Sequence, residues 1–450
     1  MELAESAQLA VEAALAEGAG DAEAYAQHQR RRELRVHGGA VENLTAASER
    51  GVGVRAWIGA RVGYAFGTEL DEAGLRELAQ RVVAAARSAD EDEHAGPPSP
   101  EGSHPELDRL RDPAIADWAA DQLVGLTLAM ERSATSRDQR VRSVEQAVYA
   151  DSDDEVAIRS SRGVACSYAA SSCYAFVQAL GEGDGSKETG LGFGLGRAPA
   201  DLDPDAIGDE GAERAAAMIG ASKPSSRSCP VVFDSTVAAS FIGLICSTLG
   251  ADSVQRGRSP FGELLGEEVA SEALVLHDDG LDPQGLAASP CDDEGTPRKR
   301  TPLIEGGRLR SFLHDTYTAR RGGAKRGGNA GRGGYRSAPS VSASNLTVAD
   351  GSLSRAELLA AAGDGIYVSD VSGLHSGVNR VNGVFSVGAA GHLLEGGELG
   401  APVREFTIAS DLLTMLKAMR DAGAEARWVP FGGMVRTPAL LIGEMAVSGS

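Results

Sequence analysis

The sequence is poor in cysteine and in aromatic residues, and it has no long apolar run. Five cysteines, none in a Cys-x-x-Cys pair, are few and odd in number for 450 residues. They argue for reduced thiols in a cytoplasmic protein, and against a disulfide framework or a cysteine-rich zinc knuckle. Aromatic residues make up 5% of the chain, so the core must rest on Ala, Val, Leu and Ile. No apolar stretch is long enough to span a bilayer, and residues 1–18 predict an acidic amphipathic helix, not a signal peptide.

Positive charge is scarce as well. The 43 Lys and Arg residues are outnumbered by 64 Asp and Glu residues, which gives a formal net charge of −21. Such a chain is repelled by nucleic acid and by anionic membranes unless it carries a separate basic patch. The one strongly basic run, residues 319–336, is rich in Gly and Arg but lacks the repeated Arg-Gly-Gly spacing of RNA-binding segments. We therefore expect neither a nucleic-acid partner nor a membrane partner.

Glycine is abundant, with 57 residues, and this favours a turn-rich β architecture. Polar linkers at 91–108 and 223–228 divide the chain. We expect an α+β protein with an α/β N-terminal region in one or two subdomains, at 1–95 and 109–222. A β-rich C-terminal domain is expected at 223–450.

Hydrophobic periodicity predicts the main elements. Residues 51–70 alternate as a β-hairpin does, and Asp71 is expected to cap the helix that follows. Further helices are expected at 3–17, 113–137, 204–219, 235–250 and 405–422. Strands are expected at 22–32, 34–37, 43–48, 141–151, 155–160, 165–180 and 188–197.

Four ordered blocks carry a family resemblance. They are GVGVRAWIGARVGYAFGTEL with the helix after it, GRSPFGELLGEEVASEALVLHDDG (257–280), the stretch 288–332 with DDEG, LIEGG and GGNAGR, and VSGLHSGVNRVNGVFSVGAAG within 371–416. In this order and spacing they resemble the TldD/PmbA family, also called modulators of DNA gyrase.

The resemblance also identifies a missing metal site. The catalytic branch of the family carries an HExxxH zinc motif on a helix, and its positions fall here on Ile242, Gly243 and Ser247. None of these side chains binds zinc or moves a proton. The cysteine ligand that the catalytic branch supplies near its C-terminus is also absent from WVPFGGMVRTPALLIGEM. No catalytic residue and no metal ligand is therefore expected in this chain.

These departures make the chain resemble the metal-free TldE/PmbA branch. That branch implies a non-catalytic subunit of a heteromeric zinc metalloprotease, paired with a TldD-like chain and forming part of a chamber for unfolded peptides. No cofactor is expected in this chain, and zinc is expected in the partner. Candidate substrate-binding residues in the resembling blocks are His314, Arg320, Asn329, Arg332 and His375. The arginines and Asn329 could hold peptide carbonyls or carboxylates, and the alternative for the histidines is a structural hydrogen bond.

Two other functions stay open. One is a self-sufficient hydrolase of a peptide-like or amide substrate in a natural-product pathway, and the other is a regulatory binding protein. Acidic clusters at 278–279 and 292–294 could be acid–base pairs, but loop carboxylates that accept backbone N–H bonds are the favoured interpretation. Self-association also stays open.

Overall fold

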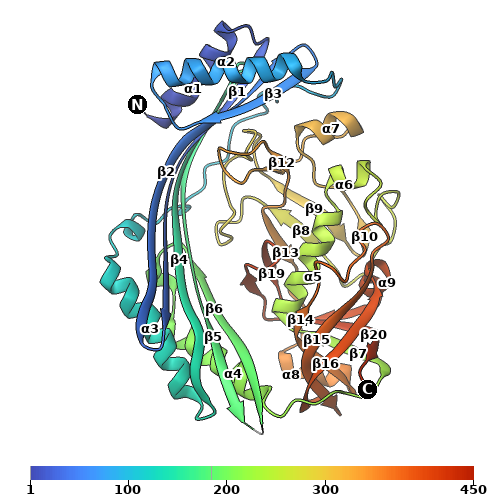
Figure 1. The fold of residues 1–450 in the computed structure, drawn as a ribbon. Helices are drawn as coiled ribbons and strands as arrows, with labels where there is room; N and C mark the ends of the chain where they lie inside the picture. The colour runs from blue at the N-terminus through green and yellow to red at the C-terminus, as the bar shows by residue number, and fades with distance from the viewer. Residues whose placement is uncertain (1, 184) are drawn as a thin grey trace.

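The N-terminal region of the computed structural model, which describes residues 2–183 and 185–450, is built on one long antiparallel sheet (Figure 1). The strand order is β3-β2-β1-β4-β5-β6. The strands are β1 (Asp21–His37), β2 (Ala40–Ile58), β3 (Arg61–Gly67), β4 (Val141–Ser160), β5 (Ala165–Gly183) and β6 (Ser186–Gly196).

Helices cover one face of this sheet. They are α1 (Leu3–Ala16), α2 (Glu72–Ser88), α3 (Ala120–Arg137) and α4 (Pro204–Ala217), with short 3-10 turns η1 (Pro113–Ala116) and η2 (Pro199–Asp201). Side chains alternate between the two faces of a strand. Ala24 and Ala26 of β1 accordingly belong to the cluster under α1 and α2, whereas Tyr25 packs with Cys166, Cys291 and Tyr335 on the other face. That second face meets the C-terminal domain.

The C-terminal domain has two six-stranded sheets with α5 (Ser235–Thr248) between them (Figure 1). Their orders are β10-β9-β8-β13-β19-β18 and β16-β15-β14-β7-β20-β17, and β11 and β12 pair as a separate two-stranded sheet. The strands are β7 (Arg227–Phe233), β8 (Leu276–Asp279), β9 (Arg300–Glu305), β10 (Arg308–Leu309), β11 (Ala330–Gly331), β12 (Ser340–Val341), β13 (Asn345–Val348), β14 (Gly365–Ser372), β15 (Val384–Glu395), β16 (Glu398–Asp411), β17 (Met419–Ala422), β18 (Arg427–Val429), β19 (Met434–Thr437) and β20 (Leu440–Ser448). The remaining helices are α6 (Ala251–Gln255), α7 (Thr316–Gly322), α8 (Arg355–Ala362) and α9 (Leu412–Lys417).

The predicted fold class is confirmed, an α/β N-terminal region followed by a β-rich domain. The hairpin is β2–β3, and the side chain of Asp71 caps α2 by accepting a 2.8 Å hydrogen bond from the Gly74 N–H. The proposed subdomains 1–95 and 109–222 share a single sheet, because β1 pairs with β4 from Glu23↔Ser160 to Val36↔Ala147.

Several predictions are wrong. Residues 113–137 are not one helix, because 113–116 form the turn η1 and α3 begins only at Ala120, and the strands predicted at 141–151 and 155–160 are the single strand β4. Residues 405–422 are not one helix, because Phe406 and Ile408 are buried on every second residue of β16, and only the six residues of α9 are helical there. The thiols are not all reduced either: Cys166 and Cys291 form a disulfide across 125 positions of sequence, whereas Cys173, Cys229 and Cys246 are free and buried. None of the described helices is long and apolar enough to cross a membrane.

Candidate functional site

The helix that carries the proposed motif positions is α5. Strand β7 leads into it, and the Asp234 side chain caps it by accepting a 2.8 Å hydrogen bond from the Thr236 N–H. Ile242 is 1% exposed and lies in the central apolar cluster of the domain. Ser247 is exposed, and its hydroxyl donates to the Leu244 carbonyl within the same helix at 2.6 Å. These two positions therefore serve the core and the helix backbone.

Gly243 has no room for a side chain. A Cβ placed on it would lie 2.1 Å from the carbonyl oxygen of Gly432 and 2.8 Å from the Gly432 carbonyl carbon. Since the obstacle is backbone, it cannot rotate away as a side chain would. The motif glutamate does not fit at 243 in this packing, and the three motif positions Ile242, Gly243 and Ser247 offer no nitrogen, thiolate or carboxylate to a zinc ion.

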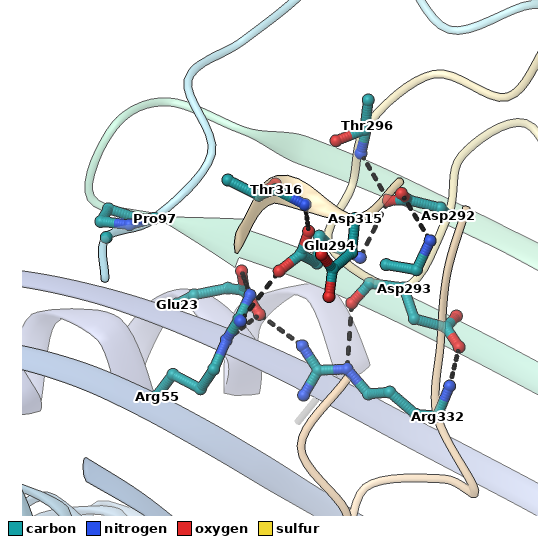
Figure 2. A network of polar contacts seen from close by, with 12 residues as sticks. Glu23, Arg55, Pro97, Asp292, Asp293, Glu294, Thr296, Asp315, Thr316 and Arg332 are labelled. Atoms are coloured by element: carbon teal, nitrogen blue, oxygen red, sulfur yellow. Dashed lines mark hydrogen bonds and ion pairs between the residues drawn. The ribbon is translucent and has the colours of Figure 1, made fainter. Parts of the chain in front are cut away.

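A buried charge network joins the N-terminal sheet to the C-terminal domain (Figure 2). Arg55 of β2 bonds Glu23 of β1 at 2.6 Å and reaches across to Glu294 at 2.9 Å. Arg332 also pairs with Glu23, and it donates to the Asp293 carbonyl at 3.0 Å. The side chains of Glu23 and Arg332 are 1% and 0% exposed. Buried charges of this kind are tolerated when each is paired and hydrogen-bonded.

The turn that supplies Glu294 is held by its own carboxylates. Asp292 accepts hydrogen bonds from the N–H groups of Glu294 (3.0 Å), Thr296 (2.9 Å) and Ala330 (3.1 Å). Burial and the nearby Glu294 raise the pKa of Asp292 to about 7. Burial alone would raise the pKa of Glu294, but Arg55 and the Thr316 N–H outweigh it and lower that pKa. The loop-carboxylate interpretation of this acidic cluster is confirmed.

A cavity of about 320 Å³ lies beside this network. Its lining includes Arg55, Trp57 and Tyr64 from the N-terminal sheet and Asp252, Gln255, Glu294, Asp315 and Tyr317 from the C-terminal domain. Asp315 caps α7 by accepting a 2.8 Å bond from the Thr318 N–H. Burial and the charge of Glu294 raise the pKa of Asp315. The cavity thus presents carboxylates together with the guanidinium groups of Arg55, Arg256 and Arg321, which suits polar groups that both donate and accept hydrogen bonds.

A larger cavity of about 840 Å³ lies between β6, α4 and the C-terminal domain. Asp234, at the start of α5, and Arg214 both line this cavity, and the Asp234 carboxylate lies 3.4 Å from the Arg214 guanidinium. The Tyr367 hydroxyl donates to Asp234 at 2.7 Å. Burial alone would raise the pKa of Asp234, but Arg214, the Thr236 N–H and the Tyr367 hydroxyl outweigh it and lower the pKa. A carboxylate that stays ionised ties α4 to α5 here.

The five predicted substrate-binding residues do not gather. Among the described residues none of the five lines either cavity. His375 is exposed in the loop between β14 and β15. His314 is partly buried; its Nδ1 is buried without a hydrogen-bond partner, and burial lowers its pKa.

The basic run holds the protein's own backbone. Arg320 donates to the carbonyls of Gly96 and Pro97 in the polar linker. Asn329 is buried and donates to Asp278 at 2.8 Å. Arg332 is buried in the charge network, so all three side chains contact the protein's own groups here, and their role in substrate binding stays a prediction. Sequence reasoning missed Arg55, because its partners Glu23 and Glu294 come from distant segments. It also missed Asp315, because only the fold brings this helix cap to the cavity beside Arg55 and Glu294.

Comparison with known proteins agrees with this architecture. Three family models match in chain order: PmbA/TldA metallopeptidase domain 1 at residues 22–86, the central domain at 113–219 and the C-terminal domain at 226–449. The chain belongs to the PmbA/TldD family. The predicted family resemblance is thereby confirmed.

Relatives span nearly the whole length. Metalloprotease PmbA of Escherichia coli O157:H7 is 27% identical over 91% of this chain and 88% of its own. A metalloprotease TldD homolog of Haemophilus influenzae is 26% identical over 89% and 87%. The crystal structure of TldE from Thermococcus kodakarensis has a TM-score of 0.91 at 20% identity, covering 99% of this chain and 100% of that one, and it shows the shared fold.

Proposed function

We propose that this chain is the non-catalytic subunit of a heteromeric zinc metallopeptidase, paired with a TldD-like chain that holds the metal. The observation that carries the proposal is the packing of α5, where the Gly432 carbonyl occupies the space that a side chain on Gly243 would need. A zinc peptidase needs ligands and a general base converging on one helix face. Here Ile242 and Gly243 on that helix pack into the domain.

The far end of the chain supports the same proposal. Residues 428–445 contain no cysteine, and they form β18, β19 and part of β20, all within the two sheets. Helix α5 contacts β18 and β19. The segment expected to bring a third ligand to α5 therefore packs beside it without one. Any zinc that acts on a peptide bond would come from the partner.

A sheet edge supports a role in assembly or in peptide contact. Residues 40–50 of β2 are exposed at every position and pair with β1, whereas the neighbouring strand β3 begins to pair only at Val52. Val41 and Leu44, each 45% exposed, are apolar side chains on this edge. An unpaired edge accepts an extended chain through main-chain hydrogen bonds, with little dependence on its sequence.

The test is to express the chain alone and together with a TldD-like relative that carries HExxxH. We expect a complex containing both chains by native mass, peptidase activity on an unfolded peptide only in the complex, and loss of that activity on chelation. Chelator-sensitive peptidase activity of the chain alone would refute the proposal and favour the self-sufficient hydrolase. A stable complex with a protein that is not a peptidase, and none with the TldD-like chain, would favour the regulatory binding protein.

Edge variants test the assembly surface. We expect Leu44→Lys to weaken complex formation or peptide cleavage, because it places a charge on the apolar edge. Leu265→Lys is the matched control, since Leu265 is also exposed (55%) but lies outside the strands. The cytoplasmic location stays a prediction, which cell fractionation checks.

A further inference from the structure

The disulfide has a histidine beside it. Cys166 is the second residue of β5 and pairs with Ile158 of β4, and Cys291 precedes the turn of the C-terminal domain that carries Asp292 and Glu294. His104 comes from the polar linker. A ring nitrogen of His104 and the two Sγ atoms all lie within 4.8 Å of one another. Three segments far apart in sequence thus bring two sulfurs and an imidazole to one point.

His104 is oriented by the same turn. Cys291 and Pro297 pair as a β-bridge that closes the turn, and His104 Nε2 donates to the Gly295 carbonyl at 2.9 Å. Because a carbonyl only accepts, the proton lies on Nε2 and the ring's lone pair lies on Nδ1. An imidazole that donates its second N–H to a backbone carbonyl is the usual arrangement of a metal-binding histidine. A disulfide by itself makes no use of this histidine.

We propose that Cys166, Cys291 and His104 form a redox-gated site for Zn²⁺, closed in the disulfide and open in the dithiol. Two thiolates and one imidazole are a ligand set that zinc favours. In a tetrahedral site with Zn–S of about 2.3 Å and Zn–N of about 2.1 Å, ligand atoms lie roughly 3.6–3.8 Å apart. The three ligand atoms already lie within 4.8 Å of one another, and breaking the S–S bond lets the two Sγ atoms move apart to this spacing.

The chemistry balances in two steps. A dithiol reductant supplies two electrons and two protons, becomes a disulfide itself, and leaves thiols at Cys166 and Cys291. Zn²⁺ then replaces the two thiol protons, which pass to solvent. The resulting site is neutral overall, which matters because Cys166 and Cys291 are 4% and 0% exposed and unpaired buried charge is costly. His104 is only partly buried, so its side gives the ion a path from solvent and a place for water as fourth ligand.

This site would give the chain a cation of its own, whereas the sequence predicted none. It is separate from the motif positions on α5 and does not depend on the proposed partner. Cys291 lies two and three positions before Asp293 and Glu294, which bond Arg332 and Arg55. The disulfide therefore fixes β5 onto the turn that anchors the charge network, and the metal would fix both β5 and the linker onto it. The reduced, metal-free form lacks both constraints.

The experiment uses the whole chain. Oxidised protein, and protein reduced with dithiothreitol and desalted under nitrogen, are each titrated with Zn²⁺ alone, and bound metal is measured by atomic emission. Co²⁺ is titrated in parallel because its thiolate charge-transfer and tetrahedral bands report the ligands directly. We expect one equivalent of bound Zn²⁺ per chain in the reduced protein and no bound Zn²⁺ in the oxidised protein. Absence of a stoichiometric site, or of thiolate bands, in the reduced wild type would overturn the proposal.

Variants assign the ligands. Cys166→Ser and Cys291→Ser should abolish stoichiometric binding. His104→Gln should weaken it by more than the roughly 10–100-fold that loss of an outer-shell partner costs. Cys173 is a buried free cysteine, so Cys173→Ser is the control for reduction and folding. This variant should bind Zn²⁺ as wild type does. Wild-type binding by the Cys166→Ser, Cys291→Ser double variant would overturn the proposal. That double variant also separates this zinc from any held by a TldD-like partner in a purified complex.

Discussion

Replacing Gly243 by alanine tests the packing that carries the proposed function. Helix propensity favours the substitution by about 1 kcal/mol. The new Cβ would lie 2.1 Å from the Gly432 oxygen, against the 3.0 Å below which Cβ contacts are essentially not found, so the loop must move by about 0.9 Å. Overpacking typically costs about 1–3 kcal/mol, and the upper end applies because the neighbour is backbone. The net loss is then about 2 kcal/mol, or a Tm lower by about 4–8 °C for a domain of this size.

The matched control is Gly125→Ala in α3, another helix interior. Gly125 is exposed, and a Cβ there would meet nothing within 4 Å, so the variant should gain about 1 kcal/mol from propensity alone. Thermal unfolding followed by circular dichroism compares both variants with wild type. If Gly243→Ala melts at or above the wild-type temperature, the 431–433 loop yields without cost. The steric argument against a glutamate at 243 then fails.

Three further outcomes are expected. Arg332→Met should lower the free energy of unfolding by about 3 kcal/mol. This is the low end for a broken buried ion pair, because Glu23 keeps its second partner, Arg55. Chemical denaturation measures the loss, and Arg336→Met at an exposed position is the near-neutral control. Asp315→Asn should raise the Tm at pH 7. The raised pKa of Asp315 makes wild-type stability fall as the pH rises, so the difference in Tm between variant and wild type should disappear below about pH 4. A Tm difference that grows as the pH is lowered would contradict this. Building HExxxH back into residues 242–247 should give no zinc binding beyond that of wild type, and bound metal by atomic emission would show otherwise.

The sequence-based predictions were correct for elements whose structure follows from their own local residue pattern. The β2–β3 hairpin, the Asp71 cap and α5 follow from alternation, a capping side chain and an apolar run. The predictions from local pattern were wrong where pairing with distant strands determines the extent of a strand. The polar run Arg30–Glu33 interrupts the alternation, yet it stays in β1 because β2 and β4 pair with it on both sides.

The site was less predictable, because its contacts are between distant segments. The acidic cluster at 292–294 was visible, and its loop role followed from its turn chemistry. The pairing of Glu294 with Arg55 could not be predicted, because nothing near Arg55 in sequence marks it as a buried charge that contacts carboxylates. The Cys166–Cys291 pairing could not be read from cysteine spacing either, because the fold alone brings the two sulfurs together.

The start and the middle of α5 explain why a missing ligand set here is consistent with a structural role for the helix. Asp234 at its start is held by Arg214 and Tyr367, and Gly243 in its middle is packed against the Gly432 backbone. A helix fixed in this way contributes core packing and contact between the N-terminal and C-terminal parts, and at Gly243 it has no room for a side chain. Interaction with a partner or a peptide then has to use surfaces that are still open. Among the described residues, the outer edge of β2 at 40–49, where β3 does not pair, is such a surface, and this is why the Leu44→Lys comparison bears directly on the proposed assembly.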